Sequence, residues 1–226
     1  MPPTIPPPDS VASTLASATL LAAAGGLLDA VVYLNHGHVF ANAMTGNVIF
    51  LGIAAMSRDR AQVVSHILPI AAFLVGVVAA RMLSSLHVRR NAALTLAVEA
   101  CALFCLGMLP SSFPQLAFVA TIALVSAFQV TTFRRVGRFT YNSTFVTGNL
   151  REVAEGAYDS LINPDPAARQ LGRARFFKLT LICVAFLLGA ILGAWAAIHH
   201  PAHAIWFAEP MLVAVLVITL RHPVKA

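Results

Sequence analysis

Long apolar runs set the strongest limit on what this chain can fold into. Six runs come close to the roughly 20 residues that cross a bilayer as a helix, and few of their residues are charged. They are Val11–Leu34, Val63–Leu86, Ala92–Leu109, Gln115–Phe133, Phe176–Ile198 and Ala202–Leu220. Because lipid cannot satisfy backbone polar groups, each run should be helical. The sequence therefore predicts an all-α integral membrane protein with six transmembrane helices.

Basic residues are divided unevenly between the two sides of such a protein. Of the fifteen Lys and Arg residues, only Arg58 and Arg60 fall on the side opposite the N-terminus. The positive-inside rule then predicts that both termini lie in the cytoplasm. The net charge of +6 belongs to residues that flank apolar spans, so it does not indicate nucleic-acid binding.

Three landmarks recur in the same order in the two halves of the chain. They are a Thr-Gly-Asn phrase, a Phe-Leu-x-Gly phrase and a glutamate: Thr45-Gly46-Asn47 with Thr147-Gly148-Asn149, Phe73–Gly76 with Phe186–Gly189, and Glu99 with Glu209. Shared helix composition could produce such matches singly, whereas their common order indicates an internal duplication.

The duplication predicts two inverted repeats of three helices each, because an odd number of spans reverses the second copy. We expect repeats at 11–110 and 115–221, with a cytoplasmic link at 134–175 inside the second, and a disordered tail at 1–10. Many secondary transporters are built in this way around a site near the bilayer midplane.

We expect the two Thr-Gly-Asn segments to be short helices that do not span the membrane. The second copy carries Arg151, Glu152, Glu155 and Asp159, and charged residues rarely cross lipid. A re-entrant, an interfacial and a bundle-packed placement all remain open. The small residues at four-residue spacing in the second and fifth spans also lead us to expect those two helices at the centre of the bundle.

Several of these phrases together are similar to a known family. The residues are Gly25–Ala30, Met44–Asn47, Gln129, Arg134–Gly137 and Phe145–Gly148, with Val130 standing where such proteins often have Asn. The chain resembles the YoaK-like family of bacterial inner-membrane proteins, which is defined by a domain of unknown function. The resemblance implies a multi-span protein of the bacterial inner membrane and no particular activity.

Three acids lie in apolar surroundings, namely Asp29, Glu99 and Glu209. Each costs about 2.5–3.5 kcal/mol at a helix centre on insertion scales, a cost that a partner, water or protonation normally offsets. We consider them as proton carriers or substrate-binding groups, and Glu99 and Glu209 as a pair that faces across the repeat axis. A purely structural role is the alternative.

Polar residues of the repeated segments are the other candidates for a substrate site. A helix that starts inside a bundle offers partial positive charge to an anion, and its Thr and Asn side chains can cap free N–H groups. The candidates are therefore Thr45, Gly46, Asn47, Gln129, Thr147, Gly148 and Asn149, with simple helix capping as the alternative.

Metal and cofactor sites are not expected. Five histidines cluster on the outer side, but no carboxylate or cysteine framework accompanies them, so we interpret them as interfacial residues. Walker, Rossmann, His-Glu-x-x-His and Ser-His-Asp patterns do not occur, and we expect no enzyme activity.

Three functions remain in competition. A small secondary transporter of an unknown small molecule or ion is the hypothesis that we favour. The alternatives are a non-transporting scaffold or assembly factor and an intramembrane enzyme that acts on lipid. The expected partners are membrane lipids, with a homodimer left open.

Overall fold

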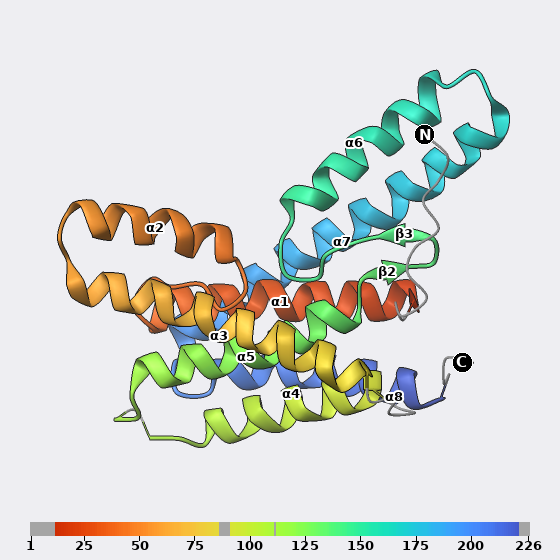
Figure 1. Ribbon diagram of the computed structural model, residues 1–226. Coiled ribbons are helices and arrows are strands. Elements are labelled where there is room, and N and C mark those ends of the chain that lie inside the picture. Colours follow the sequence, from red (N-terminus) through yellow and green to blue (C-terminus); the bar gives the residue numbers. More distant parts are fainter. Residues whose placement is uncertain (1–11, 86–90, 111, 222–226) are drawn as a thin grey trace.

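The structure, a computed structural model, describes residues 12–85, 91–110 and 112–221. The tail expected at 1–10 lies outside them. The described chain is mainly helical (Figure 1). Its helices are α1 (Leu15–Asn35), α2 (Met44–Met56), α3 (Arg60–Ser85), α4 (Asn91–Gly107), α5 (Gln115–Thr132), α6 (Thr147–Ile162), α7 (Pro166–His199), the 3-10 helix η1 (Ala204–Ala208) and α8 (Glu209–Arg221).

Within the described residues, five helical stretches are long and apolar enough to cross a membrane: α1, α3, α5, α7 and the continuous η1–α8 segment. The prediction of an all-α membrane protein is confirmed at this level. The third predicted span appears as α4, which has 17 residues and a length of about 25 Å at 1.5 Å per residue. In contrast, α7 has 34 residues and reaches about 50 Å, well beyond a hydrocarbon core of about 30 Å.

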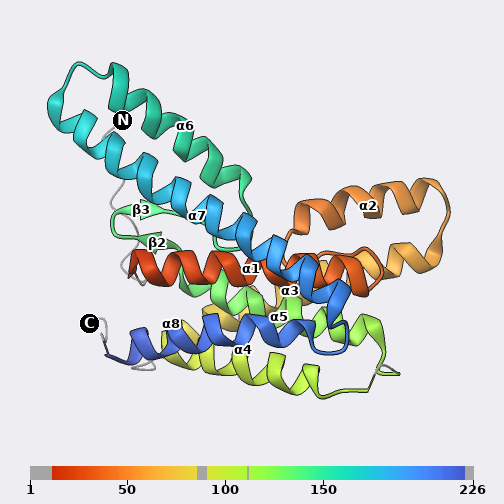
Figure 2. The same cartoon turned by 180° about the vertical axis from the view of Figure 1, so that it is seen from behind.

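The helices pack in a regular pattern. Helix α1 lies against α7, and α5 lies against α3. Helices α2 and α6 fold back on α3 and α7 respectively, while α4 contacts both α5 and α8, and α8 also contacts α1. Figures 1 and 2 show that the α2–α3 and α6–α7 hairpins extend away from the bundle at opposite ends.

The centre of the bundle is α1, which corrects the expectation that α3 and α7 would be buried there. In the most apolar window of each helix, 67% of α1 is buried, against 22% of α3 and 28% of α7. The small residues of α3 and α7 line only one face. A side chain at Gly76 would meet the backbone oxygen of Leu124, and one at Gly189 would meet that of Ala23. Close backbone approach therefore requires the small faces, while the opposite faces are exposed.

A small sheet, which the sequence did not predict, lies at the start of α1. Strand β1 (Ala12–Ser13) pairs in parallel with β2 (Arg135–Val136), which pairs antiparallel with β3 (Phe139–Thr140). Gly137, with φ of +61°, begins the two-residue turn between β2 and β3, where a glycine takes the positive φ. The hydroxyl of Ser13 donates to Arg135 O at 2.7 Å. The sheet thus ties the start of α1 to the link between α5 and α6.

Candidate functional site

Both Thr-Gly-Asn segments form half-length helices that start beside the middle of α1. The link before α2 reaches Gly25, whose backbone oxygen accepts from Asn42 Nδ2 at 3.4 Å. The link before α6 reaches the same glycine, where an added Cβ would lie 2.6 Å from Ser143 O. From this point α2 and α6 run in opposite directions (Figure 1). Gly25 is the central residue of α1 (Leu15–Asn35), so the two helix starts meet at mid-depth of the bundle.

The asparagines of the two motifs make the same pair of hydrogen bonds. Asn47 Oδ1 accepts from Phe40 N at 2.9 Å, and its Nδ2 donates to Phe40 O at 2.7 Å. Asn149 does the same with Asn142 N and O, again at 2.9 and 2.7 Å. Each asparagine therefore holds the extended link that precedes its helix to the first helical turn.

This geometry corrects the predicted capping role of the motif. Helices α2 and α6 begin after Ala43 and Val146, which make no side-chain capping bond. The asparagine amide binds a residue seven positions earlier and not the free N–H groups of its own helix. Asn149 and Glu152 have the spacing of a capping box, but the Asn149 amide binds the backbone of Asn142 instead.

The glycines and threonines of the motif differ in their surroundings. A Cβ at Gly46 would lie 2.6 Å from the Phe40 ring, and one at Gly148 would lie 3.4 Å from Asn142 Nδ2. The glycines therefore leave room for the residue that the asparagine holds. Thr45 and Thr147 are exposed, so the structure places them outside the buried cluster.

Asp29 lies one turn beyond Gly25 on α1 and is 5% exposed. Its Oδ1 accepts from Asn42 N at 2.7 Å. Asp29 thus binds the backbone at the start of α2, where the helix dipole favours negative charge.

A second polar group joins α4, α5 and the link before α6. Glu99 is fully buried, and Ser126 Oγ donates to its Oε1 at 3.5 Å. With the Gln129 amide oriented to satisfy both neighbours, Nε2 donates to both oxygens of Glu99 at 3.0 Å, and Oε1 accepts from Ser143 Oγ at 2.9 Å. Because Ser143 O also lies against Gly25, these contacts connect Glu99 to the two helix starts.

Glu209, at the start of α8, is half-buried and close enough for its charge to act on Glu99. Helices α4 and α8 are in contact, and the pairing of Glu99 with Glu209 across a repeat axis stays a prediction. The structure therefore brings together seven of the predicted site residues by direct or indirect contact: Asp29, Gly46, Asn47, Glu99, Gln129, Gly148 and Asn149. Glu209 lies at the edge of this group.

Sequence reasoning missed four members of the cluster: Asn42, Ser126, Ser143 and Thr144, each at most 2% exposed. A signal for two of them existed. Asn42 and Thr144 are separated by 102 residues, the same interval as the two Thr-Gly-Asn phrases. Polar residues at matching repeat positions could have been added to the candidates on that ground.

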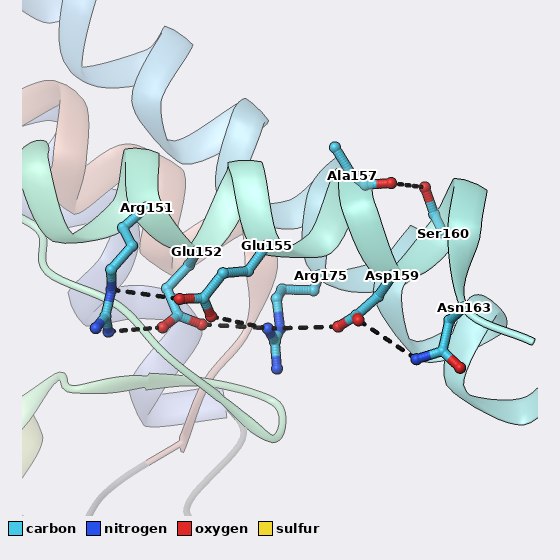
Figure 3. Close-up of polar contacts among 8 residues, drawn as sticks. All are labelled: Arg151, Glu152, Glu155, Ala157, Asp159, Ser160, Asn163 and Arg175. Atoms are coloured by element: carbon cyan, nitrogen blue, oxygen red, sulfur yellow. Dashed lines mark hydrogen bonds and ion pairs between the residues drawn. The ribbon is translucent and has the colours of Figure 1, made fainter. Parts of the chain in front are cut away.

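The charged residues of α6 run along the helix from Arg151 to Asp159, on the side that meets Arg175 of α7 (Figure 3). Arg175 of α7 contacts Glu155 Oε2 at 3.4 Å, Glu152 Oε2 at 3.7 Å and Asp159 Oδ2 at 3.8 Å. Arg151 pairs with Glu152 at 3.0 Å. These side chains are partly exposed, and each such pair is worth about 0–1 kcal/mol. The network indicates that this part of the hairpin meets water.

The outer histidines take part in aromatic packing. His36, just after α1, stacks on Phe118 with ring centroids 4.1 Å apart, and burial lowers its pKa below the ordinary value. His36 also lines a cavity of about 600 Å³ between the ends of α1, α4 and α5. None of the predicted site residues lines this cavity. Among the described residues, no three His, Cys, Asp or Glu side chains gather in a way that would hold a metal ion.

Comparison with known proteins places this arrangement in a family. The profile described as "Protein of unknown function (DUF1275)" matches residues 17–218, nearly the whole described chain. The chain belongs to the DUF1275 family. It is also 29% identical over 144 residues to the UPF0700 transmembrane protein YoaK of Bacillus subtilis (strain 168), a match that covers 61% of this chain and 64% of that relative. No solved structure matches it. This DUF1275 protein is thus a transmembrane protein, as the YoaK-like resemblance implied.

Proposed function

We propose that this DUF1275 protein is a small secondary transporter of the bacterial inner membrane, with its substrate site at the two half-helix starts. The observation that carries the proposal is the meeting of α2 and α6 at Gly25, beside buried Asp29 and the Glu99–Gln129–Ser143 chain. Interrupted helices whose ends meet near the midplane are a common way to bind substrates and coupling ions in secondary transporters. Buried acids in such a place mark ion pathways by default.

The architecture that we propose has six spans, namely the five long helical stretches and α4, arranged as two inverted repeats. Three matched observations support it. The α1–α7 contact has its counterpart in α5–α3, and the α2–α3 hairpin in α6–α7. The Asn47 bonds recur at Asn149 with the same distances. Helices α2 and α6 leave the centre in opposite directions (Figure 1).

We also propose that both termini are cytoplasmic. The start of α1 and the end of α8 lie at the same end of the bundle (Figure 1), and the order of apolar runs in the sequence assigns most basic residues to the side of the N-terminus. Reporter fusions after Arg58 and after Arg169 would test this orientation. The expected result is opposite compartments for the two loops, and a shared compartment would remove both the orientation and the inverted repeat.

Flux measurements in proteoliposomes test the transport proposal. The vesicles carry an entrapped pH dye, and a panel of small carboxylates and neutral solutes is added outside. We expect a solute-dependent pH change that falls to below about a tenth in Asp29→Asn and in Glu99→Gln, because each removes an ionisable group from the bundle centre. The matched control is Glu155→Gln, whose carboxylate is half exposed on α6. Full activity in both core variants would remove the proposed mechanism.

A non-transporting scaffold is the second candidate, and one observation favours it. The outer part of the α6–α7 hairpin extends beyond the rest of the bundle with an exposed charged face (Figures 1 and 3), as a docking surface would. Recovery of a stable stoichiometric partner that is lost on Arg175→Ala, together with no flux of any solute, would support the scaffold. Neither candidate function that we propose includes a catalytic role.

A further inference from the structure

Three buried side-chain oxygens around Gly25 have no hydrogen-bond partner. They are Asp29 Oδ2, Asn42 Oδ1 and Thr144 Oγ1. The three residues are 5%, 1% and 1% exposed, respectively. A buried oxygen left without a donor or a cation destabilises the folded state. Such a group therefore requires an explanation, and three on residues that meet at the same stretch of α1 suggest a bound species.

Asn42 and Thr144, from two different links, both contact the turn of α1 that runs from Gly25 to Asp29. Asp29 follows Gly25 by four positions, so both face the same side of the helix. Asn42 is joined to Asp29 Oδ1 through its backbone N–H at 2.7 Å and to Gly25 O through Nδ2 at 3.4 Å. Thr144 packs on the same glycine, where its Cα would lie 3.3 Å from an added Cβ.

The backbone N–H of Asn42 at the start of α2 already binds Asp29 Oδ1, and the oxygens that stay open beside it favour a cation. Asp29 Oδ2 and Asn42 Oδ1 can only accept, and a carboxylate repels an anion. Oxygen atoms of carboxylate, amide and hydroxyl groups are the ligands that hard cations prefer. The backbone oxygens of Gly25 and Ser143 border the same cluster and could add to the coordination. One carboxylate among neutral oxygens balances the charge of a monovalent cation better than that of a divalent cation.

A proton alone satisfies this cluster less completely than a metal ion does. A proton on Asp29 Oδ2 can bridge to Asn42 Oδ1, but it leaves Thr144 Oγ1 unused. A cation that takes several oxygens at once can engage all three side chains. We therefore propose that Asp29, Asn42 and Thr144 form a binding site for one sodium ion. Its role as the ion coupled to transport rests on the proposed function, whereas the site itself does not.

Thermal unfolding of the full chain in detergent tests the site directly. The midpoint is followed as sodium chloride replaces N-methylglucamine chloride at constant ionic strength and a fixed, mildly alkaline pH, with potassium chloride as a parallel arm. A ligand that binds only the folded state raises the midpoint in a saturable way. We expect that rise for sodium and a much smaller one for potassium.

Variants of the two neutral partners and the acid make the test specific. We expect Thr144→Val to weaken the apparent sodium affinity by about tenfold or more, and Thr144→Ser, which keeps the hydroxyl, to restore it. Asp29→Asn should abolish the sodium effect. The matched control is Thr121→Val, since the Thr121 hydroxyl is engaged by Ala117 O of its own helix at 2.8 Å, and it should respond as the natural chain does.

Two outcomes of the sodium titration overturn the sodium site. One is an equal rise of the midpoint with sodium and N-methylglucamine. The other is a sodium response that Thr144→Val and Asp29→Asn both leave unchanged. The same measurement repeated at lower pH without sodium gives a third outcome: stabilisation by acid alone, lost in Asp29→Asn, would assign a proton to Asp29 in place of sodium. The unfolding assay detects sodium binding independently of flux. Sodium binding by a protein that shows no flux in proteoliposomes would refute only the proposed function, and flux in a protein that binds no sodium would refute only this inference.

Discussion

Replacing Asn47 or Asn149 by alanine tests whether the two motifs do the same structural work. Each substitution removes two hydrogen bonds, at 2.9 and 2.7 Å, and leaves one backbone N–H and one backbone C=O of Phe40 or Asn142 without a partner. An unpaired buried polar group costs about 1–3 kcal/mol. Phe40 and Asn142 are only partly buried, so water can hydrate part of the two backbone groups that each substitution frees. We therefore expect the lower end of the cost of two such groups, about 2–3 kcal/mol for each variant.

Unfolding in detergent measures this cost. For a chain of this length, about 2–3 kcal/mol corresponds to a fall of roughly 4–12 °C in the unfolding midpoint. Gln170→Ala, which removes an exposed amide on α7, should change stability by less than about 0.5 kcal/mol. Asn149→Asp keeps the acceptor but sets a carboxylate oxygen against Asn142 O, so it should also destabilise.

The reasoning makes equality of the two sites part of the prediction. Because the bonds have the same lengths and partners seven residues earlier, the two alanine variants should agree within about 0.5 kcal/mol. A cost below about 1 kcal/mol at both sites would show that the amides do not hold the links. A large cost at only one site would refute the equivalence.

Two further perturbations have outcomes fixed by the described contacts. Gly76→Ala and Gly189→Ala should each destabilise the protein by about 1–3 kcal/mol, because the added Cβ meets the backbone oxygen of Leu124 or Ala23. The control Gly52→Ala, where an added Cβ has no neighbour within 4 Å, should be neutral or slightly stabilising. An equal effect at all three glycines would contradict the close packing. Burial lowers the pKa of His36 below its ordinary value of 6.5, so the folded protein favours the neutral imidazole. Stability should therefore be intact above that pH and fall as the pH drops from about 7 to about 5. The fall should be less steep in His36→Gln, and identical pH profiles of the two proteins would contradict this prediction.

Much of the fold was predictable because lipid restricts the choices. Runs such as Val63–Leu86 have to be helical, and their ends fall close to those of α3 (Arg60–Ser85). The short β2–β3 hairpin was not predicted, since two-residue strands carry no periodicity. Its turn phrase, Gly137-Arg138, is too brief to stand out beside the arginines around it. The sequence assigns this segment only to the cytoplasmic link at 134–175.

Burial of individual helices could not be predicted from small residues alone. The four-residue spacing at Gly189 and Gly193 correctly marks a contact face, since added side chains there would meet Ala23 and Leu27. The same spacing says nothing of the other faces. Exposed residues such as Leu187 and Leu188 are as apolar as buried ones in a membrane helix, so composition does not distinguish a lipid-facing side from a packed one.

The sequence by itself determined that the protein lies in a membrane and is helical, that its charge is unevenly distributed and that Thr-Gly-Asn recurs. Each of these properties depends on residue type and order alone. The tertiary structure alone decided what the recurring asparagines bind and where Asp29, Asn42 and Thr144 meet. Those contacts join residues from separate elements at Gly25. Their proximity arises from how two links fold back on α1, a three-dimensional relation that no local pattern along the chain records.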